Sequence, residues 1–372
     1  VVQDPDEAGY DGMPRNAMAT GKVDQVLSVA HMPEAFAKYD KQIALVYTPK
    51  DSKSKDGQRD WLNEVIDLLR TKTTYDFTLY KQGTLQRRIE RRMVLANIKN
   101  DDIDTYLNVL HKDPGELDIL AKDLLINVTS FFRDSEVFDL LATKFIPDLI
   151  RSHSPGKTLR IWIAGCSTGQ EAYSLAMIFR EQVAAEKRNI TVQLFASDID
   201  PDAVASAREG LYPDAIAADV SPARLARFFT KEGSSYRVSQ ELRSAVVFTV
   251  QDVLVDPPFS RLDMVSCRNL LIYLRPEAQA RAISVFHFAL RDNGLLLLGN
   301  SETIGDIDGE FAVVSKAERI FRRAGRVRSE DFAFSIGASS GARAFPVPVP
   351  NLASARQAAL ADLCQRLVMN TY

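Results

Sequence analysis

Cysteine and histidine are scarce in this chain. Its 372 residues include three cysteines and four histidines, and no two cysteines form a C-x-x-C pair. An odd number of widely spaced cysteines does not support a disulfide framework, and scattered histidines do not support a zinc site. Apolar runs of membrane-spanning length and a signal peptide are also missing. We therefore expect a cytoplasmic location, no metal chemistry and no insertion into a membrane.

An excess of positive charge is missing as well. Lysine and arginine total 46, aspartate and glutamate total 49, and the formal net charge is −3. This balance argues against general nucleic-acid binding and restricts any basic surface to local patches. The composition, 46% hydrophobic and 26% charged, is that of an ordinary globular protein, and the length exceeds one average domain.

Composition and periodicity divide the chain into five segments. Residues 1–39 are too few to form a domain alone and have the pattern of a strand, a turn and a short helix. Residues 40–57 are polar and lysine-rich, which indicates an exposed linker. Residues 58–130 carry apolar side chains at helical spacing and predict a small all-α domain. Residues 131–325 alternate strand and helix, and residues 326–372 are typical of a linker and a helix that leads to a further domain.

The alternating segment predicts an α/β fold. Helical stretches at 169–187 and 276–291 lie between apolar strand candidates, which indicates a parallel sheet covered on both faces. Residues 211–250 interrupt the alternation and indicate a small inserted β-subdomain. The strand candidates are "LRIWIAG", "TVQLFASD", "AVVFTVQD", "LDMVSCRN" and "GLLLLGN", and the sheet is expected to end with "FAVVSKAERIFRRA".

The residues that follow the strands suggest a ligand, because open α/β sheets bind ligands beyond the carboxyl ends of their strands. Gly165 opens a loop of small residues that lets the backbone approach a ligand, but this loop lacks the third glycine of a dinucleotide motif. Asp198, after the second strand, suits a ribose, and Asp252, after the third, suits an adenine amino group. Glu171 in the first helical turn disfavours a phosphate there. A cofactor with adenine, ribose and positive charge fits better, and S-adenosylmethionine is such a cofactor. The alternative is that each acid only caps a helix.

Two further groups of polar residues lie outside the strand ends. Asn127, Thr129 and Arg133 stand among apolar residues in "LLINVTSFFRD". Arg133 suits a carboxylate, such as that of a methionine group, whereas Thr129 or Ser130 is a candidate N-cap for the next helix. In "TLQRRIERRM", an apolar stripe is flanked by four arginines, which form either a solvated face or a docking surface for an acidic, glutamate-rich helix. These arginines are Arg87, Arg88, Arg91 and Arg92.

Four motifs in this order, "LLINVTSFFRD", "AGCSTGQEAYSLA", "FASDID" and "CRNLLIYL", resemble the CheR-type chemotaxis-receptor methyltransferases over about residues 58–325. The resemblance implies a class I methyltransferase fold, transfer of a methyl group from S-adenosylmethionine to glutamate side chains on chemoreceptor helices, and S-adenosylhomocysteine as product. It implies that Tyr273 lies near the substrate glutamate and that an upstream arginine, for which Arg151 is our candidate, assists. The cofactor contacts it implies are Asn127, Thr129, Arg133, Glu171, Asp198, Asp252, Val253, Arg268 and Asn269.

The start of the chain, "EAGYDGMPRNAMATGKVDQVL", is similar to the last strand and helix of CheB-type methylesterases. We therefore expect part of a CheB–CheR fusion whose esterase triad lies upstream, so that this chain has no esterase activity. Two alternatives stay open: a methyltransferase acting on nitrogen, suggested by "DPPF" at 256–259, and a regulatory module that binds the cofactor or its product without turnover. The motifs indicate neither the oligomeric state nor the particular receptor.

Overall fold

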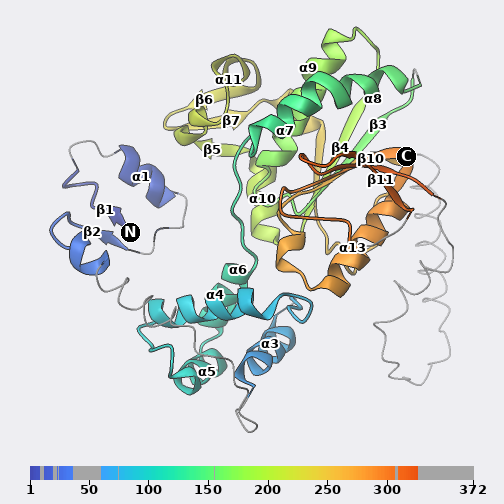
Figure 1. Ribbon diagram of the computed structural model, residues 1–372. Coiled ribbons are helices and arrows are strands. Elements are labelled where there is room, and N and C mark those ends of the chain that lie inside the picture. The colour runs from blue at the N-terminus through green and yellow to red at the C-terminus, as the bar shows by residue number, and fades with distance from the viewer. Residues whose placement is uncertain are drawn as a thin grey trace, which may run out of the picture. The chain divides into compact units, whose positions relative to one another are not determined.

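The structure, a computed structural model, describes residues 1–8, 12–19, 23, 25–36, 60–73, 75–154, 156–305 and 309–325 (Figure 1). The predicted linker at 40–57 and the predicted final helix lie outside the described residues. None of the helices in the described ranges is long and apolar enough to cross a membrane.

The first segment contains a parallel pair of short strands joined through a helix. β1 (Val2–Gln3) pairs with β2 (Val26–Leu27), and α1 (Gly12–Ala19) lies between them in the chain. The sequence predicted one strand and a helix, and the structure adds β2, which is too short to give a periodic signal.

Residues 60–125 form four helices around one apolar core. Asp60, Asp102 and Asp113 each accept a hydrogen bond from a backbone N–H in the first turn of the helix that follows, which satisfies a donor the helix itself leaves unpaired. The apolar stripes of the helices meet in a core that includes Leu69, Ile89 and Tyr106. The helices are α3 (Trp61–Lys72), α4 (Gln82–Leu95), α5 (Ile103–Lys112) and α6 (Pro114–Leu124).

A seven-stranded sheet follows, with the order β11-β12-β10-β9-β3-β4-β8. The five strands from β10 to β8 are parallel, whereas β12 and β11 are antiparallel. The predicted parallel sheet is confirmed for these five strands, and the predicted last segment of the sheet adds an antiparallel hairpin at one edge, because a short turn between β11 and β12 allows only antiparallel pairing. The strands are β3 (Leu159–Ala164), β4 (Val192–Asp198), β8 (Val246–Val250), β9 (Leu262–Cys267), β10 (Leu290–Leu298), β11 (Phe311–Ser315) and β12 (Ile320–Arg323).

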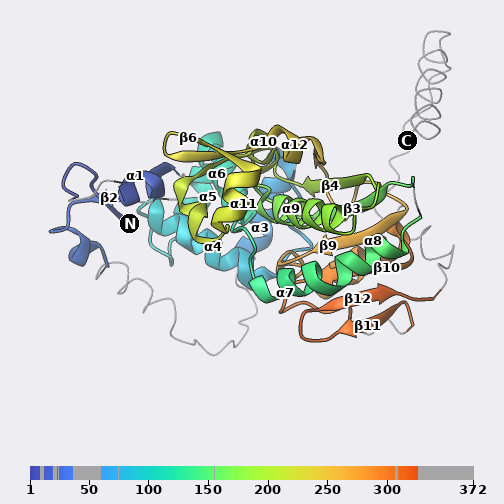
Figure 2. The same ribbon diagram turned by 90° about the horizontal axis from the view of Figure 1, so that it is seen from above.

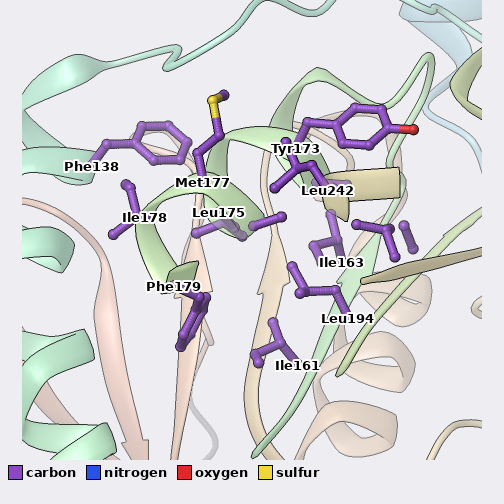
Figure 3. Close-up of a cluster of buried hydrophobic side chains, with 14 of the residues drawn as sticks. Phe138, Ile161, Ile163, Tyr173, Leu175, Met177, Ile178, Phe179, Leu194 and Leu242 are labelled. Carbon is purple, nitrogen blue, oxygen red and sulfur yellow. The ribbon is translucent and has the colours of Figure 1, made fainter. Parts of the chain in front are cut away.

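Apolar side chains cover both faces of this sheet, as its uninterrupted hydrophobic strands require. On one face, α9 (Gln170–Ala185) packs on β3 and β4 with the helical stretch formed by α7 (Ser135–Leu140), a π-helical turn (Leu141–Phe145) and α8 (Ile146–Ser152). Figure 3 shows this cluster, with Ile161, Ile163 and Leu194 of the strands facing side chains of α9. On the other face, α13 (Pro276–Ala289) packs on β9 and β10.

An insertion leaves the sheet after α10 (Pro201–Glu209) and returns at β8. Figure 2 labels α11, β6 and α12 of this insertion. Its three strands form an antiparallel sheet of order β5-β7-β6. β8 is an edge strand of the main sheet, and the Arg208 guanidinium donates two hydrogen bonds to the carbonyl of Phe248 in its middle. The elements of the insertion are β5 (Leu211–Pro213), a 3₁₀ turn (Asp214–Ala218), α11 (Pro222–Phe228), β6 (Phe229–Glu232), β7 (Ser235–Val238) and α12 (Gln240–Ser244).

Candidate functional site

A pocket lies at the carboxyl ends of β3, β4, β8 and β9, where the chain passes from one side of β3 to the other. Sheets of this type bind ligands at such a switch point. Ten predicted cofactor residues and Tyr273 line the pocket together. They are Asn127, Thr129, Arg133, Gly165, Glu171, Asp198, Asp252, Val253, Arg268, Asn269 and Tyr273.

Asp198 presents a buried carboxylate at one corner of the pocket. One of its oxygens accepts from the backbone N–H of Ser167 (2.7 Å) and the other from that of Asp200 (3.0 Å). Burial raises the pKa of Asp198, and these N–H donors oppose the shift. Ser167 has a left-handed backbone (φ 49°), and its buried hydroxyl has no partner in the structure. A carboxylate acceptor beside an unpaired hydroxyl matches the hydroxyls of a ribose.

Asp200 has a different role from Asp198. Its side chain accepts from the backbone N–H groups of Asp202 and Ala203 at the start of α10 and from the side-chain amide of Asn127. The helix-cap alternative therefore holds for Asp200, whereas Asp198 faces the pocket. The Asn127 contact ties the segment after α6 to α10.

Asp252 forms a second acidic corner, together with a tyrosine that the sequence did not single out. The carboxylate of Asp252 accepts from the Leu254 N–H (2.8 Å), and burial raises its pKa. Tyr80 enters the pocket wall from the all-α domain, and burial raises its pKa, to which the negative charges of Asp252 and Asp198 add. Its only sequence signal is an aromatic residue in a loop directly before a basic helix.

Arg268 is a buried cation behind the pocket. Its side chain is 1% exposed, and it donates to Asp134 (2.6 Å), the backbone carbonyl of Arg133 (2.8 Å) and Glu171 (3.5 Å). Glu171 also accepts from the hydroxyl of Ser266 (2.6 Å). Arg268 thus joins the end of β9, the start of α9 and the loop that carries Asn127, Thr129 and Arg133.

This loop bends where the sequence suggested a helix cap. α7 begins only at Ser135, and its N-cap position is Asp134, so neither Thr129 nor Ser130 caps it. Left-handed backbone at Ile126, Phe132 and Asp134 turns the chain sharply. Apolar periodicity in "LLINVTSFF" does not reveal such turns.

Tyr273 lies in a 3₁₀ turn (Leu271–Tyr273) at the pocket wall. Its carbonyl accepts from the Lys81 N–H (2.8 Å), the Arg275 N–H donates to the carbonyl of Leu79 (2.8 Å), and Tyr80 forms an antiparallel bridge with Leu274. This short strap, residues 79–81 with 273–275, joins the all-α domain to the sheet and carries both tyrosines.

The arginines predicted to serve in docking and catalysis lie in different environments. Arg92 forms two hydrogen bonds with Glu116, and Arg88 is half-buried and donates to the carbonyl of Asp123 (2.6 Å). Arg87 and Arg91 are the exposed pair on α4. Arg151 is not among the pocket residues: it lies on α8 and pairs with Asp148 and Glu186. The structure therefore removes Arg151 from the candidate site.

The pocket fits a cofactor that has hydrogen-bond donors and positive charge. Asp198 and Asp252 present carboxylates, Glu171 and Arg268 are paired with each other at the back wall, and Arg133 is a further pocket-lining cation. An additional phosphate would face these acids, while a sulfonium or ammonium group would be attracted to them. No cluster of metal-ligating side chains occurs among the described residues.

Comparison with known proteins agrees with this geometry. The family described as CheR methyltransferase, SAM binding domain, matches residues 127–320, and the CheR methyltransferase all-alpha domain matches residues 60–125. A putative methyltransferase of Pseudomonas putida, Cher3, is 32% identical over 70% of this chain and 95% of its own length. A chemotaxis protein methyltransferase of Listeria innocua is 34% identical over 62% of this chain and 84% of its own length.

A larger relative is similar over most of the chain. An uncharacterized 104.1 kDa protein of Rhodobacter capsulatus is 39% identical over 87% of this chain, which spans 36% of that protein. The predicted fold class and cofactor are confirmed. The chain therefore belongs to the CheR methyltransferase family, and its cofactor is S-adenosylmethionine.

Proposed function

We propose that the chain methylates glutamate side chains on the cytoplasmic helices of chemoreceptors. The observation that carries this proposal is the setting of Tyr273, which lines the cofactor pocket and whose backbone carbonyl accepts from the N–H of Lys81, the residue directly before the basic helix α4. Burial lowers the pKa of Arg88, and the neighbouring Asp123 and Tyr273 act in the opposite direction. A tyrosine hydroxyl at the pocket wall and a half-buried guanidinium on the helix that follows are both suitable donors for an incoming carboxylate.

When bound, S-adenosylmethionine supplies a methyl group on a sulfonium, and an attacking carboxylate oxygen forms the new bond as the bond to sulfur breaks. Glutamate has a reference pKa of about 4.3, so it is already ionised at neutral pH and the chain needs no general base. Tyr273 would orient the carboxylate, and Arg88 would attract it and replace part of its hydration. Such positioning contributes up to roughly 7–11 kcal/mol in favourable cases.

The acidic residues of the pocket wall would bind the cofactor in this proposal. Asp198 would accept from the ribose hydroxyls and Asp252 from the adenine amino group. Arg133, which lines the pocket and donates to the Val128 carbonyl (3.2 Å), would hold the carboxylate of the methionine group. These contacts would hold the cofactor in the pocket that Tyr273 also lines.

The exposed face of α4 supports docking of an acidic partner. Arg87 and Arg91 are exposed, although Arg91 also lies 3.8 Å from the Asp123 carboxylate, while Leu85, Ile89 and Met93 bind the helix to its domain. A glutamate-rich receptor helix is such a partner, and two exposed cations one turn apart favour its approach. Arg92 is excluded from this role because Glu116 occupies it.

We also propose that residues 1–39 are the end of a CheB-type methylesterase domain within a signalling hybrid. The β1-α1-β2 unit with parallel strands supports it, as does the length of the Rhodobacter capsulatus relative. Incubation of the chain with a methyl-esterified receptor fragment tests esterase activity, and release of methanol would contradict the expectation that this chain has none.

The test of the main proposal uses S-adenosylmethionine labelled on the methyl group and a chemoreceptor cytoplasmic fragment. We expect label on the fragment that mild alkali releases as volatile methanol, because carboxyl methyl esters hydrolyse under these conditions. A fragment whose methylation-site glutamates are replaced by alanine is the control and should take up no label. Alkali-stable label would indicate methylation of nitrogen and refute the proposal. Cofactor binding without any transfer would indicate a regulatory module.

A further inference from the structure

We propose that Glu302 is a positioning residue that holds Asn269, on the cofactor side, and Tyr273, on the substrate side, in one fixed arrangement. Glu302 lies in the loop after β10 and is not among the residues that line the pocket. Its action on Asn269 concerns the cofactor alone. Its action on Tyr273 rests on the proposed function.

The Glu302 carboxylate is a clamp on the backbone of the neighbouring loop. The side chain is 3% exposed, and its Oε2 accepts from the N–H groups of Gly299 (2.6 Å) and Asn269 (3.0 Å), while its Oε1 accepts from that of Ile272 (3.3 Å). Since β9 and β10 are neighbours in the sheet, the clamp links the loops that follow two adjacent strands.

The backbone of Asn269 is left-handed (φ 63°), a conformation that asparagine tolerates better than most residues with a Cβ. For a residue with a Cβ this conformation costs energy and persists only where its surroundings enforce it. The bond from its N–H to Glu302 fixes the peptide on one side of this turn. Asn269, which lines the pocket, is therefore positioned by a residue that does not line the pocket itself.

The second carboxylate oxygen of Glu302, Oε1, accepts a hydrogen bond from the turn that carries Tyr273. The residue before this 3₁₀ turn, Leu270, has an apolar side chain and gives it no cap. The N–H of Ile272 bonds to Glu302 instead, one residue before Tyr273. The same carboxylate thus sets the start of the turn whose last residue faces the substrate.

The hydrogen-bond donors around Glu302 and the space left by Gly299 both indicate that this site is shaped to hold the Glu302 carboxylate. Burial raises the pKa of Glu302, and the groups that oppose this shift are backbone N–H groups of Gly299, Asn269, Ile272 and Leu271. A Cβ at Gly299 would lie 2.8 Å from the Glu302 Oε2 and 2.9 Å from the Asn269 nitrogen, so only glycine leaves room for the carboxylate. A buried carboxylate is costly, whereas an apolar side chain would fill the space without that cost.

Two substitutions break the clamp in independent ways. Glu302→Gln keeps the size but turns an NH₂ group toward backbone donors, and Gly299→Ala displaces the carboxylate while leaving its chemistry unchanged. We expect either change to weaken S-adenosylhomocysteine binding, measured by calorimetry on the full chain, about tenfold. With a receptor fragment as substrate, kcat should fall by a similar factor.

Asp263 provides the matched control, because it is a buried acid at the opposite end of β9. It accepts from the Arg160 N–H (2.8 Å) and from Arg291 (2.8 Å), away from the pocket. Asp263→Asn should lower the thermal midpoint but leave the Kd for S-adenosylhomocysteine unchanged. If Glu302 acts through Asn269, adding Glu302→Gln to Asn269→Ala should cause little further loss of affinity.

Wild-type affinity for S-adenosylhomocysteine in the folded Glu302→Gln and Gly299→Ala variants would overturn the proposal. So would full additivity with Asn269→Ala, because it would show that Glu302 does not act through that residue. Failure of the wild-type chain to methylate any receptor fragment would count against the proposed function, but it would leave the binding comparison intact.

Discussion

Replacement of Arg268 by methionine tests how the pocket is held together. Arg268 is nearly inaccessible and bonds Asp134, Glu171 and the Arg133 carbonyl. Methionine is similar in length but leaves two carboxylates without their cation in a region shielded from water. Removal of one partner from a buried ion pair costs about 3–5 kcal/mol. Because Asp134 is 34% exposed and can be hydrated, we expect the lower end, about 3 kcal/mol.

For a domain of this size, a loss of about 3 kcal/mol lowers the thermal midpoint by roughly 6–12 °C. Thermal denaturation followed by circular dichroism measures this shift, and calorimetry with S-adenosylhomocysteine measures binding below the midpoint. We expect binding to weaken as well, since Arg268 orients both Glu171 and the loop of Arg133.

Arg224 offers a matched control for this experiment. It forms two 2.9 Å hydrogen bonds with Glu181 and lies over the ring of Phe132, outside the pocket. Arg224→Met should cost about 1 kcal/mol and leave the affinity for S-adenosylhomocysteine unchanged. The reasoning fails if Arg268→Met is no more destabilising than Arg224→Met.

Three further predictions concern the pocket and its mouth. Asp198→Asn should weaken S-adenosylhomocysteine binding by roughly 10- to 100-fold, because a charged acceptor is lost. Burial raises the pKa of Asp198, so its carboxylate is protonated at a higher pH than is usual for an aspartate. The affinity of the wild type for S-adenosylhomocysteine should therefore decline as the pH falls toward that pKa, and the decline should be smaller in Asp198→Asn. Equal pH profiles for the two proteins would contradict this prediction. Tyr80→Ala should weaken binding about tenfold, and unchanged calorimetry would exclude Tyr80 from the cofactor contacts. Arg87→Glu with Arg91→Glu should raise KM for a receptor fragment and leave the Kd for S-adenosylhomocysteine unchanged; a KM equal to that of the wild type would refute docking at α4.

The strand-end residues were predictable because parallel strands bring their carboxyl ends to one edge. An acid directly after an apolar strand, such as Asp198 or Asp252, therefore reaches the pocket whatever the details of packing. The strands themselves follow from runs of buried apolar residues, as in β9, where all six residues are buried. The sequence could not show that Asp198 faces the pocket whereas Asp200 caps α10, since both residues lie at the end of the same strand.

Residues that reach the site from other elements were missed for a common reason. Tyr80 lines the pocket only because the strap of residues 79–81 pairs with 273–275, and Glu302 acts only because β10 lies beside β9. Both contacts depend on tertiary neighbours that no local pattern reveals. The place of Arg151 outside the pocket has the same origin, because a helix near the first strand in the chain does not place its side chains at the carboxyl end of that strand.

The contact of Arg208 with β8 should limit self-association of the protein at high concentration. A strand at the border of a sheet normally exposes a ladder of unused peptide groups onto which a foreign chain can add, and the exposed Val247 and Val250 make such addition more favourable. The guanidinium of Arg208 occupies the Phe248 carbonyl at the centre of this ladder. An incoming strand would have to expel a charged group before it could form its first bonds. Arg208→Ala should therefore leave the fold intact and increase self-association at high protein concentration, which light scattering would detect.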